Sequence, residues 1–266
     1  MDNRSPMPTL MNQWWLALYS GALLVMISSG VLFYCCPSIS PLRFGLQAAL
    51  VSAYILFLLQ RNLILNRPGS DRQLGPSLGP ANWITLARGG LIALLAGFWL
   101  QPWPGTSHGA GWTMWIPGII YLTASAGDVI DGYVARQTAN QTLLGELLDT
   151  RLDALGILTA SLVAIHYGQL PDFYISAGLA YYLLRLALWL RRKTGRPCNE
   201  VKPRKGACLM AGAQMVFLTI VLLPLLTPPL THFAAVVLLI PFLAGFLIDW
   251  QVVCRHARFN HVHRGI

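Results

Sequence analysis

Charged residues are scarce in this sequence. They make up 11% of its 266 positions, whereas 55% are hydrophobic and the mean hydropathy is +0.54. Soluble domains average about 25% charged residues, so the composition excludes an ordinary soluble fold. It predicts an all-α protein, a polytopic integral membrane bundle of helices.

Cysteines and acidic residues are also few. The five cysteines have no metal-ligand spacing, and Cys35 and Cys36 lie within an apolar run, which argues against a disulfide framework or a zinc site. The 10 acidic residues are outnumbered by 19 basic ones, for a net charge of +9. Because the basic residues lie in short loops between apolar runs, we interpret them as topology signals and contacts to membrane lipids. We expect no nucleic acid partner.

Long apolar runs recur along the chain and predict about eight transmembrane helices, of which the second is short. An even number of spans places both termini on one side of the membrane. The first run is too long for the core of a signal peptide, so we expect it to be retained. The predicted spans are 14–36, 44–59, 84–100, 112–134, 143–166, 173–190, 207–226 and 233–250.

Lysine and arginine are distributed unevenly between the loops. They follow the second, fourth, sixth and eighth spans, whereas loops 101–111, 167–172 and 227–232 contain none. The positive-inside rule therefore predicts that both termini and the active site face the cytoplasm. We expect the membrane to be the inner membrane of a bacterium.

Residues 60–80 differ in composition from the apolar runs around them. They are rich in Gly, Pro, Asn and Arg, which is typical of a loop. We interpret them as a cytoplasmic connector that ends an accessory part, residues 1–80, with two helices. A six-helix core with a cytoplasmic tail then occupies residues 81–266.

Four aspartates recur at helical spacing in the middle of the chain: Asp128, Asp131, Asp149 and Asp153. At about 3.6 residues per turn, the first two lie on one face of a helix and the last two on one face of the next. Asp131 and Asp149 are equally far from the middle of the polar turn between the helices, near residue 140. An antiparallel hairpin therefore brings these two to the same depth, about 13 Å from the turn.

Facing carboxylates in a bilayer need cations, because an isolated ionised carboxylate there costs several kcal/mol. The run 128–153 contains no histidine or cysteine, and oxygen ligands alone favour Mg²⁺ or Mn²⁺ over zinc. Two such ions would balance four carboxylates and attract a diphosphate. We therefore predict a two-metal site with these four aspartates as ligands.

Small residues accompany the aspartates on the same helical faces. Gly132, Ala135 and Gly145 remove side-chain bulk there, which would let a flat or phosphorylated group approach the backbone. Small residues also let membrane helices pack closely, and for one glycine alone that is the better explanation. Because all three are in register with the aspartates, we expect them to line the binding site.

The run from Asp128 to Asp153 resembles the complete signature of the CDP-alcohol phosphatidyltransferase family: Asp-x-x-Asp-Gly-x-x-Ala-Arg, eight residues, then Gly-x-x-x-Asp-x-x-x-Asp. The six spans of residues 84–250 are similar to that family's core, and the accessory part lies outside the resemblance. The resemblance implies transfer of a substituted phosphoryl group from a cytidine diphosphate donor, usually CDP-diacylglycerol, to an alcohol, with release of CMP. It also implies a membrane homodimer.

Position by position, the resemblance gives Asp128, Asp131 and Asp149 as metal ligands. It gives Asp153 as the catalytic base, able also to share a metal. The remaining positions imply the pocket for the cytidine diphosphate: Gly132, Ala135, Arg136 and Gly145.

The predicted third span opens with PANWITLAR at residues 80–88, which is similar to the family's Pro-Asn-x-x-Thr-x-x-Arg with Ala81 inserted. Asn82 and Thr85 share a face suited to hydrogen bonding a nucleotide or a phosphate, so we assign them to the donor site. Asn82 could instead cap the helix, and Thr85 could bond its own backbone. Arg88, near the membrane edge, could be a snorkelling anchor.

Basic residues supply the candidates for binding the acceptor. Arg185 lies about 9 Å inside the end of the sixth span, and an intramembrane arginine usually faces a polar cavity. Lys205 stands with Gly206 where the family often has a Gly-Lys pair, although the order here is changed. We predict both as acceptor contacts, and a phosphorylated polyol such as glycerol 3-phosphate as the acceptor.

Two alternative functions remain open. On the same fold, a soluble CDP-aminoalcohol could be the donor and diacylglycerol the acceptor. The aspartates could also bind the transported ion of a divalent-cation transporter. Inverted repeats or broken helices in both halves would favour transport, and the sequence shows neither.

The loop charges predict how introduced cysteines react. In a cysteine-free background, a cysteine in loop 101–111 should react with a membrane-impermeant maleimide on intact cells, and one in loop 60–80 should react only after lysis. The opposite pattern would place the site outside the cytoplasm and contradict the predicted orientation.

Overall fold

The computed structural model describes residues 6–69, 73–104, 111–138, 141–195 and 205–262. All regular structure in these residues is helical, which confirms the predicted all-α class. Short 3₁₀ turns are η1 (Leu63–Leu65), η2 (Gly111–Trp115) and η3 (Asp172–Tyr174). The α-helices are α1 (Met7–Cys35), α2 (Pro41–Asn62), α3 (Pro80–Gly97), α4 (Ile116–Gln137), α5 (Leu143–His166), α6 (Ile175–Lys193), α7 (Lys205–Leu222) and α8 (Pro228–Val262).

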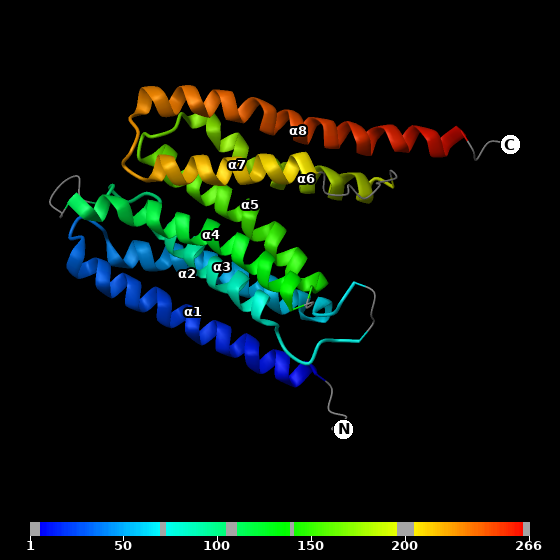
Figure 1. Ribbon diagram of the computed structural model, residues 1–266, viewed down its shortest axis with the longest axis horizontal. Coiled ribbons are helices and arrows are strands. Elements are labelled where there is room, and N and C mark those ends of the chain that lie inside the picture. The colour runs from blue at the N-terminus through cyan, green and yellow to red at the C-terminus, as the bar shows by residue number, and fades with distance from the viewer. Residues whose placement is uncertain (1–5, 70–72, 105–110, 139–140, 196–204, 263–266) are drawn as a thin grey trace.

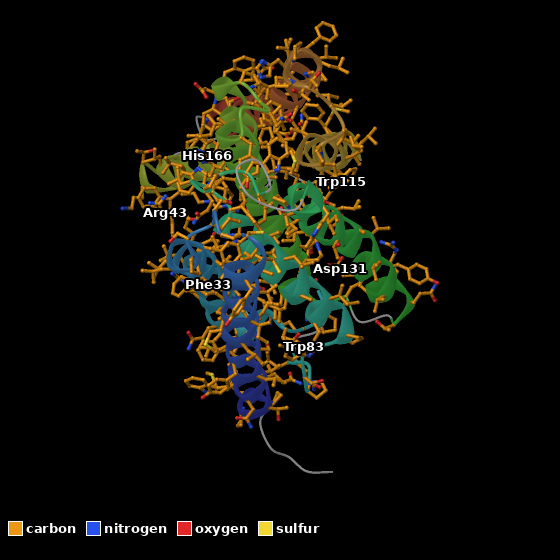
Figure 2. All side chains as sticks on the ribbon, turned by 90° about the vertical axis from the view of Figure 1, so that its left-hand side faces the viewer. Phe33, Arg43, Trp83, Trp115, Asp131 and His166 are labelled. Atoms are coloured by element: carbon orange, nitrogen blue, oxygen red, sulfur yellow. The ribbon has the colours of Figure 1, made fainter. Side chains whose placement is uncertain are left out.

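The outside of the bundle is apolar, as a membrane protein requires. Large hydrophobic side chains such as Phe33 and Trp115 lie on its surface (Figure 2). The chain thus folds as a helical membrane bundle. Within the described ranges, four helical segments are long and apolar enough to cross a membrane by length and composition alone: Met7–Cys35, Pro41–Leu65, Asp172–Lys193 and Pro228–Val253.

The helices agree in number with the predicted spans, but several ends differ. α2 runs for 22 residues from Pro41, so the second span is not short. α8 runs for 35 residues and continues beyond the predicted end at residue 250. Proline starts both α2 and α3, where its missing N–H removes no helical hydrogen bond. Thr142 caps α5, because its hydroxyl accepts a hydrogen bond from the Gly145 N–H at 3.1 Å.

α3 is the helix around which the charged residues gather. It packs extensively against α2, α4 and α5, whereas α4 and α5 contact each other only slightly. α7 packs on α4 and α5, and α8 lies along α6 and α7 on the far side of the bundle (Figure 1). The two helices that carry the aspartates therefore face each other across a space that α3 borders.

The accessory helices pack directly against the beginning of α5. Leu10 and Trp14 of α1, Leu59 of α2, and Leu144 and Leu148 of α5 belong to one buried apolar cluster. The beginning of α1, the end of α8 and the beginning of α5 all lie at the same end of the bundle (Figure 1). The accessory part thus packs against the rest of the protein at the end where α5 begins, and α2 also packs along α3.

Candidate active site

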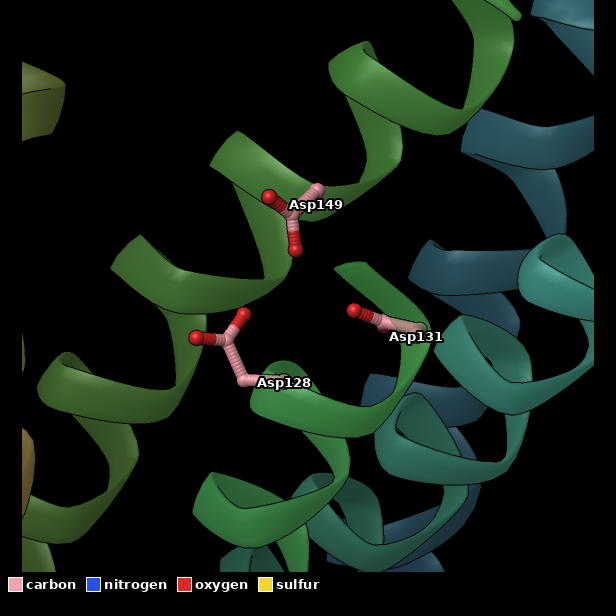
Figure 3. Close-up of side chains that lie close together, drawn as sticks. All are labelled: Asp128, Asp131 and Asp149. Atoms are coloured by element: carbon pink, nitrogen blue, oxygen red, sulfur yellow. The ribbon is translucent and has the colours of Figure 1, made fainter. Parts of the chain in front are cut away.

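Three of the predicted metal ligands come together in the structure. Asp128 and Asp131 of α4 and Asp149 of α5 each place a carboxylate oxygen within 4.8 Å of the others (Figure 3). Asp131 is buried, and the other two are partly exposed. The helical spacing of the aspartates predicts that these carboxylates lie close together.

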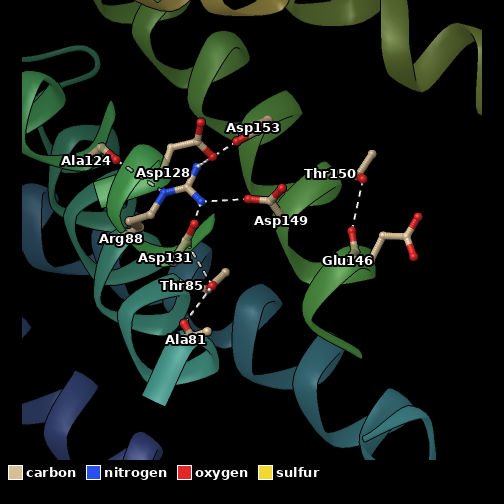
Figure 4. Close-up of polar contacts among 10 residues, drawn as sticks. All are labelled: Ala81, Thr85, Arg88, Ala124, Asp128, Asp131, Glu146, Asp149, Thr150 and Asp153. Atoms are coloured by element: carbon tan, nitrogen blue, oxygen red, sulfur yellow. Dashed lines mark hydrogen bonds and ion pairs between the residues drawn. The ribbon is translucent and has the colours of Figure 1, made fainter. Parts of the chain in front are cut away.

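The guanidinium of Arg88, from α3, lies between all four aspartates (Figure 4). Its Nη1 is 2.9 Å from Asp131 Oδ2 and 2.8 Å from Asp149 Oδ1. Its Nη2 is 2.9 Å from Asp128 Oδ1 and 2.6 Å from Asp153 Oδ1. One side chain therefore pairs with every carboxylate of the predicted site.

Burial makes these ion pairs important for stability. Arg88 is 3% exposed, and its Nε donates to the carbonyl of Ala124 at 3.2 Å. All three guanidinium nitrogens thus have acceptors, as buried polar groups require. The interpretation of Arg88 as a snorkelling anchor is therefore wrong. The sequence did carry a signal for its role, because Arg88 follows Thr85 by one helical turn on the same face.

Thr85 contacts the most buried aspartate. Its Oγ1 lies 2.9 Å from Asp131 Oδ2 and 3.0 Å from the carbonyl of Ala81. A hydroxyl has one proton, and donation to a carboxylate gives the stronger hydrogen bond. Thr85 thus helps to orient Asp131, in addition to any contact that it makes with a ligand.

A cavity of about 420 Å³ lies next to the aspartates. Small-molecule sites usually have volumes of about 300–1,000 Å³. Asp131 and Asp149 line this cavity, so it is continuous with the carboxylate cluster. Every residue predicted to contact the donor lines it too: Asn82, Thr85, Gly132, Ala135, Arg136 and Gly145.

Other residues on the cavity wall were missed by the sequence analysis. They are Gly69, Ala81, Gln141, Thr142, Leu143 and Glu146. Thr142 had a recognisable signal, because a threonine before an apolar run is typical of a helix N-cap. Gly69 had none, since its position depends on how the connector folds back onto α5.

The glycines on the wall leave room for neighbouring side chains. A Cβ at position 145 would lie 2.7 Å from Asn82 Oδ1 and 3.3 Å from Thr142 Oγ1. A Cβ at position 132 would lie 3.3 Å from Arg136 Nη1. Gly145 therefore accommodates the amide of Asn82, and Gly132 lets Arg136 fold back over its own helix.

Asn82 does not cap α3, so that alternative is wrong. Gly79 occupies the cap position, and no side chain bonds there. The Asn82 amide nitrogen instead donates to Asn66 Oδ1 at 3.3 Å and to Thr142 Oγ1 at 3.4 Å. Asn82 thus bridges the connector and the beginning of α5.

The clustered side chains fit a hard divalent cation. The three ligand atoms are carboxylate oxygens, the type that Mg²⁺ and Mn²⁺ prefer. Four carboxylates share a single guanidinium, so the cluster carries excess negative charge that cations would offset. Asp153 lies outside the group of three, although it pairs with the same Arg88.

The structure does not bring Arg185, one of the two predicted acceptor contacts, to this cavity. Arg185 is exposed on α6 and is not among the lining residues. Lys205 is the first residue of α7, but its side chain lies outside the described part of the chain. Their role in acceptor binding stays a prediction.

Comparison with known families agrees with this geometry. The model of the CDP-alcohol phosphatidyltransferase family matches residues 79–249, well over half of the chain. The chain belongs to the CDP-alcohol phosphatidyltransferase family. It is therefore a phosphotransferase enzyme of phospholipid biosynthesis, and the family match favours this activity over the cation transporter. Comparison with curated proteins gives no significant match.

The burial of Arg88 predicts a large loss of stability on its removal. Arg88→Met leaves four carboxylates without their cation. Breaking a buried pair typically costs about 3–5 kcal/mol, which applies to the pair with Asp131, whereas the pairs with the partly exposed aspartates contribute less. We expect a clearly lower melting temperature in detergent. Added Mg²⁺ should restore more stability to this variant than it adds to the wild type, because the cation would then be the main source of positive charge.

Arg43→Met is the matched control for this measurement. Arg43 is exposed, and its Nη1 donates to the carbonyl of Leu100 at 3.0 Å. It should melt near the wild-type temperature with or without Mg²⁺. If Arg88→Met behaves like Arg43→Met, the carboxylates do not depend on Arg88.

Proposed function

We propose that this enzyme transfers the phosphatidyl group of CDP-diacylglycerol to a phosphorylated polyol such as glycerol 3-phosphate and releases CMP. The proposal rests on one observation: Asp131 and Asp149 line the same cavity as the residues predicted to bind the donor. A cytidine diphosphate in this cavity would have its phosphates beside the carboxylate cluster. The basic side chain of Arg136 on the wall supports an anionic substrate.

In the transfer step, the acceptor hydroxyl gives its proton to Asp153 while its oxygen attacks the phosphatidyl phosphorus. A new phosphorus–oxygen bond to the acceptor forms as the bond to CMP breaks, and CMP leaves with the bonding electrons. Asp153 is suited to this role because its side chain is 26% exposed and Arg88 holds it at 2.6 Å. Positioning of this kind supplies much of the catalysis in phosphoryl transfer.

The metals would be held by Asp128, Asp131 and Asp149, with Asp153 able to share one. When bound, two Mg²⁺ or Mn²⁺ ions would stabilise negative charge on the diphosphate as the phosphorus–oxygen bond breaks. Arg88 contacts oxygens of the same carboxylates, so metal ligation would draw some of these contacts away from it.

The proposal includes an orientation and an assembly. The loop charges favour a cavity that faces the cytoplasm, and we propose that the membrane is a bacterial inner membrane. The family resemblance implies a homodimer among the membrane lipids. The arrangement of the helices supports this orientation, because the beginning of α1 and the end of α8 lie at the same end as the beginning of α5.

The decisive experiment identifies the lipid product. Purified protein in detergent is given CDP-diacylglycerol, Mg²⁺ and one alcohol at a time: glycerol 3-phosphate, inositol phosphate or serine. We expect CMP release with glycerol 3-phosphate and a new anionic phospholipid. Product formed only from a CDP-aminoalcohol and diacylglycerol would establish the alternative reaction instead.

The cluster predicts a loss of activity when a carboxylate loses its charge. Asp131→Asn and Asp149→Asn keep the side-chain shape, and we expect CMP release to fall to background while the protein stays folded in detergent. Asp172→Asn, an exposed aspartate in η3, is the control and should keep full activity. Full activity of the wild type in excess chelator would contradict the metal mechanism.

The variant Asp153→Asn distinguishes two roles for Asp153, catalytic base and metal ligand. If Asp153 is the base, turnover should fall by about 10² to 10⁴ while Mg²⁺ and donor affinities change little. The measurement is turnover beside Mg²⁺ titration of the melting temperature. Weakened metal binding equal to that of Asp149→Asn would make Asp153 chiefly a ligand and assign proton removal to another group.

A further inference from the structure

The connector before α3, residues 60–80, forms part of the cavity wall, although the family model matches only from residue 79 onward. Gly69 lines the cavity, and the carbonyl of Arg67 accepts a hydrogen bond from the Leu143 N–H at 3.0 Å. That bond satisfies one of the free N–H groups at the beginning of α5. The connector is therefore attached to the same turn of α5 that borders the cavity.

Asn66 is the best-anchored residue of this connector. It is 0% exposed, its N–H donates to the Leu63 carbonyl at 3.0 Å, and its carbonyl accepts from the Gly75 N–H at 2.7 Å. Its side chain uses both ends as well, because Nδ2 donates to the Ser77 carbonyl at 3.0 Å and Oδ1 accepts from Asn82 at 3.3 Å. A buried amide with every group bonded has a fixed orientation.

This bonding also fixes the orientation of the Asn82 amide. The Ser77 carbonyl can only accept, so Asn66 must turn Nδ2 toward it and Oδ1 toward Asn82. Asn82 must then present Nδ2 to Asn66, and the second Nδ2 proton goes to Thr142 Oγ1. With both amide protons used, Asn82 Oδ1 has no hydrogen-bond donor among the described residues and lies close to Gly145 on the cavity wall.

We propose that Asn66 is a positioning residue that makes Asn82 Oδ1 a fixed hydrogen-bond acceptor for the nucleotide of the donor. The inference rests on the proposed function, since it assumes that this cavity holds the cytidine nucleotide. A fixed acceptor attracts a hydrogen-bond donor and disfavours an anionic phosphate oxygen. Asn82 therefore recognises either the amino group of cytosine or a ribose hydroxyl, not the diphosphate.

The test measures nucleotide binding directly, apart from turnover. The full-length protein in detergent with Mg²⁺ is titrated calorimetrically with CMP, with UMP, which lacks the amino group, and with 2′-deoxy-CMP and 3′-deoxy-CMP, which each lack one ribose hydroxyl. We expect the wild type to prefer CMP to one of the three analogues, which identifies the recognised group. Asn66→Ala should weaken CMP binding about five-fold and reduce that preference by a similar factor, the size of one net hydrogen bond.

Two variants distinguish positioning from a loosened connector. Asn66→Asp keeps an acceptor for Asn82 but loses the bond to Ser77, so it should retain the nucleotide preference while melting lower. Gln13→Ala removes the acceptor for the Leu78 N–H at 2.7 Å in the same connector without touching Asn82, and should bind CMP as the wild type does. An equal loss in Gln13→Ala would overturn the proposal.

A double-mutant cycle tests whether Asn66 acts through Asn82. Asn66→Ala should add nothing to the loss caused by Asn82→Ala, because the acceptor that it orients is already gone. Additive losses would overturn the inference, as would a wild type that binds CMP and all three analogues equally. Failure of the wild type to bind CMP at all would instead contradict the proposed function.

Discussion

The ion pairs between the buried Arg88 and four aspartates are the interaction on which the rest of the structure depends. Carboxylates inside an apolar bundle are stable only beside positive charge. Arg88 supplies this charge from α3 to side chains of α4 and α5, which hardly contact each other. Because Arg88 must reach all four carboxylates, the position of α3 is fixed, and with it the cavity wall that α3 provides through Asn82 and Thr85.

The same cluster explains how a stable site can also bind ions. Four carboxylates and one guanidinium leave a formal charge of −3, so the cluster still attracts cations. Two divalent ions would bring the sum to +1, which suits the approach of a diphosphate. A neutral cluster would be more stable in the membrane, but it would have little affinity for either group.

Much of the site could be predicted from the sequence because it follows helical periodicity. The spacing of Asp128, Asp131 and Asp149 is local information, and two regular helices are enough to bring them together. The role of Arg88 depends on how closely α3 approaches α4 and α5, which periodicity does not specify. Arg185 was predicted to contact the acceptor from its depth in α6, but that depth does not determine which way its side chain faces.

The structure of the connector could not be predicted, because its loop composition indicates neither its path nor its hydrogen bonds. Its path matters because α3 has two separate structural roles. Asn82, at the outer turn, bonds to the connector, whereas Arg88, nearly two turns further along, bonds to the aspartates. Thr85 lies between them, lines the cavity and bonds to Asp131, so the residues proposed to contact the nucleotide adjoin those that bind the carboxylates. If Asn82 contacts the nucleotide as proposed, a change in the connector would alter nucleotide binding at the outer turn while Arg88 keeps its ion pairs with the aspartates.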